Sequence, residues 1–250
     1  MKSGKSTFIN KVFKECNTNN SYNNSTIGLN LYTMKDINNF AILDSPGDTE
    51  ISKNLEIFAS KGYLLTKLLV YIINEENELD ADSLGNNKNL DILIESLAKY
   101  KIPLLIFLTH CDTYCKKVKE EDKNWKQTCK EHFDENKKKL LSHINELLEN
   151  QFKCDFKMNE NDIMHIVLQE INSISDEEVI KRLNPKLKEK YDKGDQKEKS
   201  LIIESVRYGM ESTENEVNDF LKNELKVLGQ KELIEIMKLK LPSQFHNALN

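Results

Sequence analysis

Four residues close to the start of the chain, Gly4-Lys5-Ser6-Thr7, have the types and order needed to bind phosphate. They match the second half of the pattern Gly-x-x-x-x-Gly-Lys-Ser/Thr, in which backbone N–H groups and the positive end of a helix attract phosphate oxygens. We predict that the segment from Ser3 to Thr7 surrounds the phosphates of a nucleotide. Lys5 would reach the β- and γ-phosphates, and the Ser6 hydroxyl would bind Mg²⁺.

The same pattern extends ahead of the first residue of the chain. Its first glycine should lie five residues before Gly4, and the strand that leads into the loop should come earlier still. We therefore expect a nucleotide-binding domain that is truncated at its amino terminus, with its first strand missing. Taken alone, Gly-Lys-Ser in a Lys-rich chain is equally well explained by chance.

A second motif, Asp44-Ser45-Pro46-Gly47, follows the apolar run 40–43. In an Asp-x-x-Gly motif at the end of a strand, Asp44 would hold Mg²⁺ through water and the Gly47 N–H would contact the γ-phosphate. Glycine suits this place because the backbone must come close to the phosphate. An ordinary Pro-Gly turn is the alternative, but the order and distance after the first motif favour nucleotide binding.

Thr26 comes at the end of an Asn-rich segment, 17–25, which cannot bury apolar surface and is expected to be a loop. Its place between the first two motifs fits the threonine that completes Mg²⁺ coordination when a γ-phosphate is present. Ser25 and Thr33 are the alternatives for this role, and a plain polar loop residue is the alternative to the role itself.

A third motif, Thr109-His110-Cys111-Asp112, directly follows the apolar run 103–108. It matches Asn/Thr-Lys-x-Asp, with histidine in place of lysine. An aspartate at this place accepts hydrogen bonds from the N1 and N2 groups of guanine, and adenine has no matching pair of donors. We therefore predict that Asp112 selects guanine, with Thr109 and His110 beside the base. The alternative is an ordinary loop that begins after a strand.

The elements that would position these residues can be recognised from hydrophobic periodicity. Apolar runs too short for helices predict strands, and amphipathic stretches between them predict helices. The expected strands are 29–34, 40–43, 68–73, 103–108 and 163–168, and the expected helices are 5–14, 51–66, 87–99 and one that ends near 150. This alternation predicts an α/β fold, a three-layer sandwich with a mostly parallel sheet and helices on both faces.

The strand signal stops after about residue 174. Segments 175–178 and 213–216 have the capping-box pattern of helix starts, and an apolar helical stripe follows the second of them. We therefore predict two domains, a GTP-binding (G) domain over residues 1–174 and a helical extension over residues 175–250.

Composition narrows the class of protein. The chain has 250 residues, 38% of them hydrophobic and 31% charged, with a formal net charge of −5. This suits one α/β domain with a small extension, and gives no electrostatic reason to expect nucleic acid as a partner. The apolar runs are too short to span a bilayer, and the first residues show no secretory signal.

Five cysteines, an odd number, predict free thiols in a reducing compartment, which we take to be the cytoplasm. Four residues, Cys111, Cys115, Cys129 and His132, have spacings loosely like those of a zinc site. This alternative is less favoured because Cys111 lies inside the third motif and zinc ligands need a local turn of their own.

The motifs Gly-Lys-Ser, Thr, Asp-x-x-Gly and Thr-x-x-Asp occur in the order found in P-loop GTPases. Over roughly residues 1–175 the chain resembles the translation-factor-related class of these proteins. Residues 3–10 and 44–48 look most like its large, immunity-associated and septin-like branches, and residues 109–112 look like the base motif of the immunity-associated family and its chloroplast-translocon relatives. The resemblance implies binding of GTP or GDP with Mg²⁺, slow hydrolysis and nucleotide-dependent self-association, often at membranes.

Phosphoryl transfer needs positioned charge and a positioned water. The residues expected to act on the γ-phosphate are Lys5, Thr26 and Gly47, and those expected to hold Mg²⁺ are Ser6, Thr26 and Asp44. Asp48 follows the second motif, where Ras-like GTPases have a water-orienting glutamine. The only arginines are Arg182 and Arg207, so the predicted G domain contains no arginine finger. We expect a slow GTPase switch; the alternative is a non-catalytic GTP-binding scaffold that works through its helical extension.

Overall fold

The architecture was obtained as a computed structural model. It describes residues 4–13, 30–33, 41–44, 68–75, 90–91, 94–95, 98–99, 103–155, 157–167, 174–225, 227–243, 246 and 249. The predictions for Ser3, Thr26 and Gly47 lie outside these residues. For Asp44 the structure describes the backbone alone.

A parallel sheet of three strands forms the centre of the molecule. Its order is β3 (Leu69–Asn74), β4 (Leu104–Thr109) and β5 (Ile163–His165). In register, Leu69 is paired with Leu104 and Ile106 with Ile163. All six residues of β4 are buried, which is why this run has no alternation of polar and apolar residues. The strands predicted over 68–73 and 103–108 are confirmed, and the one predicted over 163–168 is a strand over Ile163–His165.

Two further strands, β1 (Asn30–Thr33) and β2 (Ala41–Asp44), form an antiparallel pair in which Asn30 lies opposite Asp44. Both were predicted from short apolar runs. Within the described residues this pair and the parallel sheet are separate sheets. Tyr32 and Ile42 pack against the same apolar cluster as the parallel strands.

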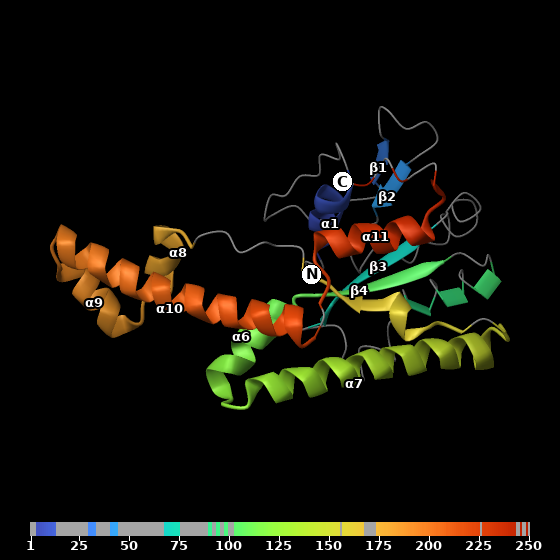
Figure 1. Ribbon diagram of the computed structural model, residues 1–250, viewed down its shortest axis with the longest axis horizontal. Helices are drawn as coiled ribbons and strands as arrows, with labels where there is room; N and C mark the ends of the chain where they lie inside the picture. The colour runs from blue at the N-terminus through green and yellow to red at the C-terminus, as the bar shows by residue number, and fades with distance from the viewer. Residues whose placement is uncertain are drawn as a thin grey trace.

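One face of the parallel sheet is covered by two helices from opposite ends of the chain. Helix α1 (Lys5–Val12) packs its Phe8 ring on Phe107 of β4, with ring centroids 5.4 Å apart. Helix α11 (Gln230–Lys240) lies beside α1 (Figure 1), and the Gln230 side-chain amide donates to the Lys11 carbonyl at 2.6 Å. Their shared cluster consists of Phe8, Ile9, Val12, Phe13, Ile72, Leu105, Phe107, Met164, Ile166, Leu233, Ile234, Met237 and Leu249.

The opposite face is covered by α7 (Trp125–Glu146) and by helical residues within 90–99. The side chains that point to this face alternate along the strands with those that face α1. Their cluster consists of Ile73, Leu90, Ile94, Leu104, Ile106, Leu108, Leu140, Ile144, Leu148, Met158 and Ile163. Helices thus cover both faces of a parallel sheet, and the predicted three-layer α/β fold with additional C-terminal helices is confirmed.

Three helices project from this body toward one side (Figure 1). They are α8 (Asp176–Lys181), α9 (Pro185–Lys193) and the long α10 (Gln196–Asn223). Ser175 caps α8 by accepting from the Glu178 N–H, as its capping-box pattern predicted. None of the described helices is long and apolar enough to cross a membrane.

The helix start predicted at residues 213–216 is wrong, because α10 continues through them. The Thr213 hydroxyl donates to the Gly209 carbonyl one turn earlier, at 3.0 Å, instead of capping a new helix. Val217 and Phe220, on the same helix, are buried against helix α6 (Cys111–Glu121) and α7. Burying these side chains stabilises an unbroken helix more than a second N-cap would.

Candidate functional site

Helix α1 begins in a form suited to an anion. Its N-cap is Gly4, whose φ of 85° is strained for any other residue. Glycine supplies no capping side chain and the first turn contains no acidic residue, so the positive end of the helix dipole is not neutralised from within. Lys5 and Ser6 lie in this first turn, half-buried. The structure therefore places both residues at the positive end of a helix, as predicted.

The third motif forms the junction between β4 and α6. Thr109 is the last residue of β4, and its hydroxyl donates to the Ile73 carbonyl of β3 at 3.0 Å. Because that proton is already used, the Thr109 oxygen accepts from His110 Nδ1, 3.0 Å away. Nδ1 of His110 therefore carries a hydrogen in this bond. Its backbone, at φ 66°, turns the chain sharply from strand into helix.

Asp112 is the second residue of α6, where the helix dipole favours a carboxylate. Its side chain is 32% exposed and lies 3.7 Å from Lys116 Nζ, one helical turn later. The same Lys116 ammonium donates to Glu214 of α10 at 3.0 Å. Asp112 is thus accessible to a ligand at the carboxyl end of β4. Lys116 links it to the long helix α10.

Two polar residues near this junction, the buried Glu75 and the partly buried His165, were not predicted from the sequence. Glu75 directly follows β3, and its carboxylate accepts from the Cys111 thiol at 3.4 Å and bonds to His165 at 3.1 Å. Burial, and next the Glu75 carboxylate, raise the pKa of Cys111 well above its usual range. The signals available in the sequence were a glutamate that ends the run 68–74 and a histidine inside an apolar run.

The less favoured zinc set does not come together as a site. Cys115 and Cys129 hydrogen-bond to each other between α6 and α7, and this bond, followed by burial, raises the pKa of Cys115. His132 stacks on the Tyr114 ring at 4.0 Å and its Nε2 accepts from Asn136 at 3.0 Å. Burial lowers the pKa of His132, which favours the neutral ring that this bond needs. These side chains join the two helices, and the four cysteines described by the structure are free thiols.

Asp44 is the last residue of β2, which matches its predicted place at the end of a strand. Thr33, one alternative to Thr26, is paired with Ala41 in the β1–β2 hairpin. The metal and γ-phosphate roles of Asp44, Thr26 and Gly47 stay predictions.

Comparison with known proteins decides the class of this site. A family model for 50S ribosome-binding GTPases matches residues 1–146, more than half of the chain. The chain belongs to this GTPase family. The match includes both α1 with Lys5 and the β4–α6 junction with Asp112, so the prediction of a P-loop GTPase is confirmed. The family match does not separate the immunity-associated and septin-like branches. No curated protein and no solved structure matches the chain significantly.

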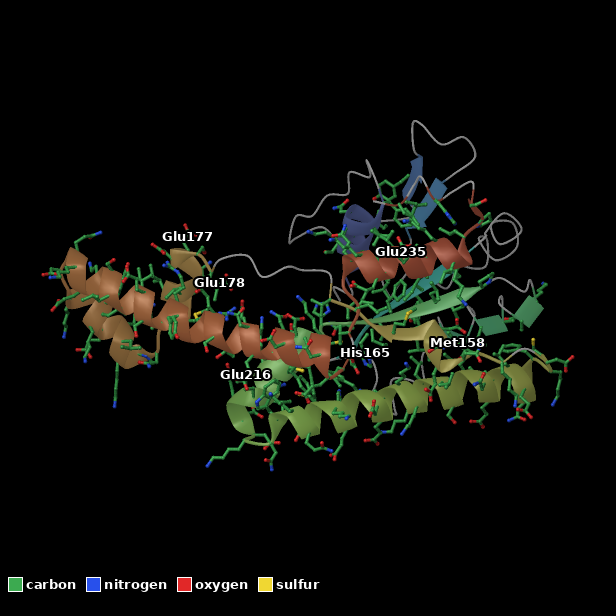
Figure 2. All side chains as sticks on the ribbon, viewed as in Figure 1. Met158, His165, Glu177, Glu178, Glu216 and Glu235 are labelled. Carbon is green, nitrogen blue, oxygen red and sulfur yellow. The ribbon has the colours of Figure 1, made fainter. Side chains whose placement is uncertain are left out.

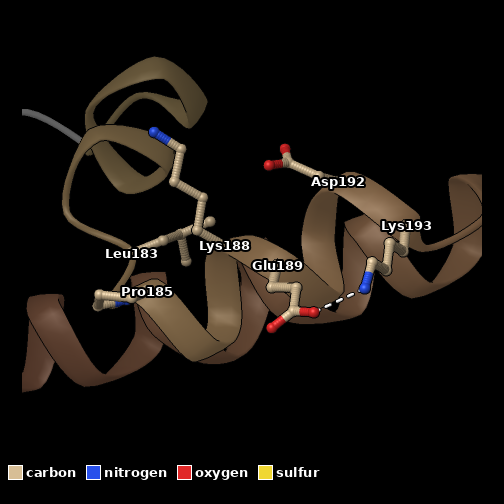
Figure 3. Close-up of a pocket in the computed structure, with 6 residues that line it drawn as sticks. All are labelled: Leu183, Pro185, Lys188, Glu189, Asp192 and Lys193. Atoms are coloured by element: carbon tan, nitrogen blue, oxygen red, sulfur yellow. Dashed lines mark hydrogen bonds and ion pairs between the residues drawn. The ribbon is translucent and has the colours of Figure 1, made fainter.

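A shallow hollow of about 460 Å³ lies elsewhere on this GTPase, against α9 (Figure 3). Its lining is mostly charged, and one carboxylate in it is already paired: Glu189 bonds to Lys193 at 2.6 Å. Figure 1 places α9 far from α1, at the outer end of the projecting helices. The hollow is therefore not part of the nucleotide site.

Proposed function

We propose that this chain is a guanine-nucleotide switch that binds GTP with Mg²⁺ and hydrolyses GTP slowly. The observation that carries the proposal is the β4–α6 junction, where a partly exposed Asp112 stands at the start of a helix directly after a buried strand. Membership of a GTPase family makes guanine-nucleotide binding the expected task of that carboxylate.

In this proposal the Asp112 carboxylate accepts from the N1 and N2 groups of guanine. The His110 ring lies beside the base in the place of the usual lysine stem and is held there by the bond between its Nδ1 and the Thr109 hydroxyl. An adenine base offers no matching donors, so the Asp112 carboxylate would be left unsatisfied. An unsatisfied group of this kind costs about 1–3 kcal/mol of binding free energy.

The phosphates would lie at the start of α1, against the Lys5 ammonium and the backbone of the first turn. A hydroxyl and a carboxylate are the ligands Mg²⁺ prefers, and Ser6 at the head of α1 and Asp44 at the end of β2 fit that donor set together with Thr26. When bound, Mg²⁺ neutralises charge on the β- and γ-phosphates. The chain's own part is to hold these phosphates through Lys5.

Hydrolysis is proposed to be slow because the residues that speed it in other GTPases are missing. Neither Arg182 nor Arg207 belongs to the part of the chain matched by the family model. In the sequence, Asp48 directly follows the Asp-x-x-Gly motif, at the position where Ras-like GTPases have a water-orienting glutamine. An arginine supplied by a partner raises the rate of such enzymes by about 10³–10⁵, so the chain alone should lack most of that acceleration.

A scaffold that binds GTP without hydrolysing it is the second candidate, and one contact favours it. Lys116 bridges Asp112 and Glu214, so the occupant of the base site can influence the projecting helix α10 without any chemistry on the phosphate. A single-turnover assay of phosphate release separates the two. We expect slow, Mg²⁺-dependent release from the unmodified chain and none from Lys5→Ala; equal background release from both would favour the scaffold.

The finer assignment is also a proposal. The strings at residues 44–48 and 109–112 support a place near the immunity-associated branch, with nucleotide-dependent self-association as the property that would follow. The free thiols support a reducing compartment such as the cytoplasm.

The base assignment is tested by Asp112→Asn. The new amide donates where the carboxylate accepted, so affinity for GTP should fall by about 10- to 150-fold, the loss of one charge-assisted hydrogen bond. Affinity for xanthosine triphosphate should rise, because xanthine presents an acceptor at that position. Both are measured by calorimetric titration in the presence of Mg²⁺.

Lys116→Met is the matched control, since it breaks the ion pair with Asp112 and leaves the carboxylate in place. It should keep the preference for GTP over xanthosine triphosphate. If Asp112→Asn binds both nucleotides as the unmodified chain does, Asp112 does not read the base.

A further inference from the structure

Three metal-ligating side chains meet at the carboxyl edge of the parallel sheet. Glu75 directly follows β3, Cys111 begins α6 after β4, and His165 ends β5. Because β3, β4 and β5 are adjacent and parallel, their ends lie at the same edge. Figure 2 shows His165 where the sheet meets α7 and the end of α10. The Glu75 side chain is 0% exposed, that of His165 is 12% exposed, and Cys111 is buried.

Two of the three distances among these side chains are those of ligands around one ion. Cys111 Sγ lies 3.4 Å from a Glu75 oxygen, His165 Nε2 lies 3.1 Å from Glu75, and all three ligand atoms are within 4.8 Å of one another. In a tetrahedral zinc site with bonds of about 2.3 Å to sulfur and about 2.0 Å to nitrogen and oxygen, sulfur and oxygen are about 3.5 Å apart and nitrogen and oxygen about 3.3 Å apart. The distances from Glu75 to Cys111 and to His165 therefore already match those of ligands on one ion.

The donor set selects the kind of metal. A thiolate, an imidazole and a carboxylate are the three ligand types that zinc uses in proteins, whereas Mg²⁺ and Ca²⁺ prefer oxygen alone. We propose that Glu75, Cys111 and His165 bind a divalent transition metal of the zinc class, separate from the Mg²⁺ of the nucleotide site. This site is independent of the proposed nucleotide chemistry.

The surroundings suit a tightly held ion. The Phe133 ring packs on His165 with centroids 5.0 Å apart, and Cys111 belongs to an apolar cluster that also includes Trp125 and Phe220. Water is thereby kept from most of the site, and three protein ligands leave the fourth tetrahedral position for one small group. On binding, the Cys111 S–H bond breaks, a sulfur–metal bond forms, and the thiol proton passes to solvent. The proton that His165 Nε2 shares with Glu75 also leaves through solvent, the ring keeps its other proton on Nδ1, and the freed Nε2 lone pair and a Glu75 oxygen complete the metal bonds. No electron is transferred.

The site adjoins the base motif, since Cys111 lies between His110 and Asp112. A metal on this sulfur would hold the first turn of α6 to the end of β3. Without the metal, the thiol and the imidazole both bond to Glu75, which satisfies the same atoms by hydrogen bonds alone. The experiment has to distinguish these two arrangements.

The test uses Co²⁺ as a spectroscopic probe on the full chain, stripped of metal and nucleotide. We expect one Co²⁺ per chain with a sulfur-to-cobalt charge-transfer band, displaced by one equivalent of Zn²⁺. Cys111→Ser should abolish the band. Glu75→Gln and His165→Gln, which keep hydrogen-bonding groups in place, should each weaken binding at least about tenfold. Cys154→Ser, a half-buried thiol outside the cluster, should change nothing.

Folding of each variant is checked by thermal unfolding, which also provides a second readout. Zn²⁺ should raise the melting temperature of the metal-free unmodified chain and of Cys154→Ser, because it binds the folded state, and should raise that of Glu75→Gln by less at the same Zn²⁺ concentration. The proposal fails if the folded, unmodified chain gives no charge-transfer band. It also fails if the band is lost in Cys115→Ser but kept in Cys111→Ser, or is unaffected by both Glu75→Gln and His165→Gln.

Discussion

Replacing Lys5 with alanine should lower the affinity for GTP with Mg²⁺ by roughly 100-fold or more. Lys5 belongs to the first turn of α1, which contains no acidic residue. Two charge-assisted bonds, to the β- and γ-phosphates, contribute about 1.5–3 kcal/mol each, and about 1.4 kcal/mol corresponds to a tenfold change in affinity. Calorimetric titration or a fluorescent GTP analogue measures the effect.

Lys11→Ala, on the same helix, is the matched control. Lys11 lies in the last turn of α1, and its contact with Gln230 uses the backbone carbonyl, which the substitution keeps. Affinity for GTP should stay within about twofold of the unmodified chain, because the effect of a charge on the helix dipole is limited to the end turns. An equal loss in both variants would show that general positive charge, rather than a specific phosphate contact at Lys5, attracts the nucleotide.

Leu233→Ala should destabilise the whole body by about 2–5 kcal/mol, the usual cost of this substitution at a fully buried site. Leu233 is 0% exposed and lies in the cluster that joins α11 to α1 and the sheet. Domains of this kind are stable by only ~5–15 kcal/mol, so the midpoint of thermal unfolding should fall by ~4–20 °C. Circular dichroism or calorimetry follows the transition.

Leu239→Ala makes the same chemical change on the same helix. Its side chain is 85% exposed, so its stability should stay within about 0.5 kcal/mol of the unmodified chain. If the two variants have the same melting temperature, α11 does not contribute to the core beneath α1. The same conclusion follows if only a separate transition at higher temperature shifts.

The strands of this fold could be predicted because their signal is local. The runs 68–73 and 103–108 are apolar throughout, and 163–168 is apolar except for His165. A run of that length with no regular alternation is explained by a strand covered on both faces. The same holds for the β4–α6 junction: its motif follows a buried strand, and the structure places Asp112 in the first turn of the next helix.

The sequence could not show which surfaces these elements pack against. The periodicity of α11 identifies its apolar face but not the surface that the face covers, which is α1. Leu228 likewise pairs with Ile166 beside β5, although residues 175–250 had been expected to form a helical extension. The division of the chain at residue 174 stays a prediction.

The buried trio of Glu75, Cys111 and His165 was missed for the same reason. Glu75 is 36 residues from Cys111 and 90 from His165, and no spacing rule links ligands at such separations. Only the order of the parallel strands brings their ends together. The zinc alternative considered cysteines close in sequence, and of those only Cys111 belongs to the trio.

The contact between α1 and α11 also has a consequence for how the chain is made. Lys11 and Gln230 are 219 residues apart, and translation at about 5–20 residues per second separates their synthesis by roughly 10–45 s. During that interval Phe8 and Ile9 have no α11 to cover them, although the rest of their helix has left the ribosome. Nascent chains of this protein should therefore depend on chaperones until α11 emerges, and a ribosome stalled within α10 should hold a chain that binds chaperone through α1.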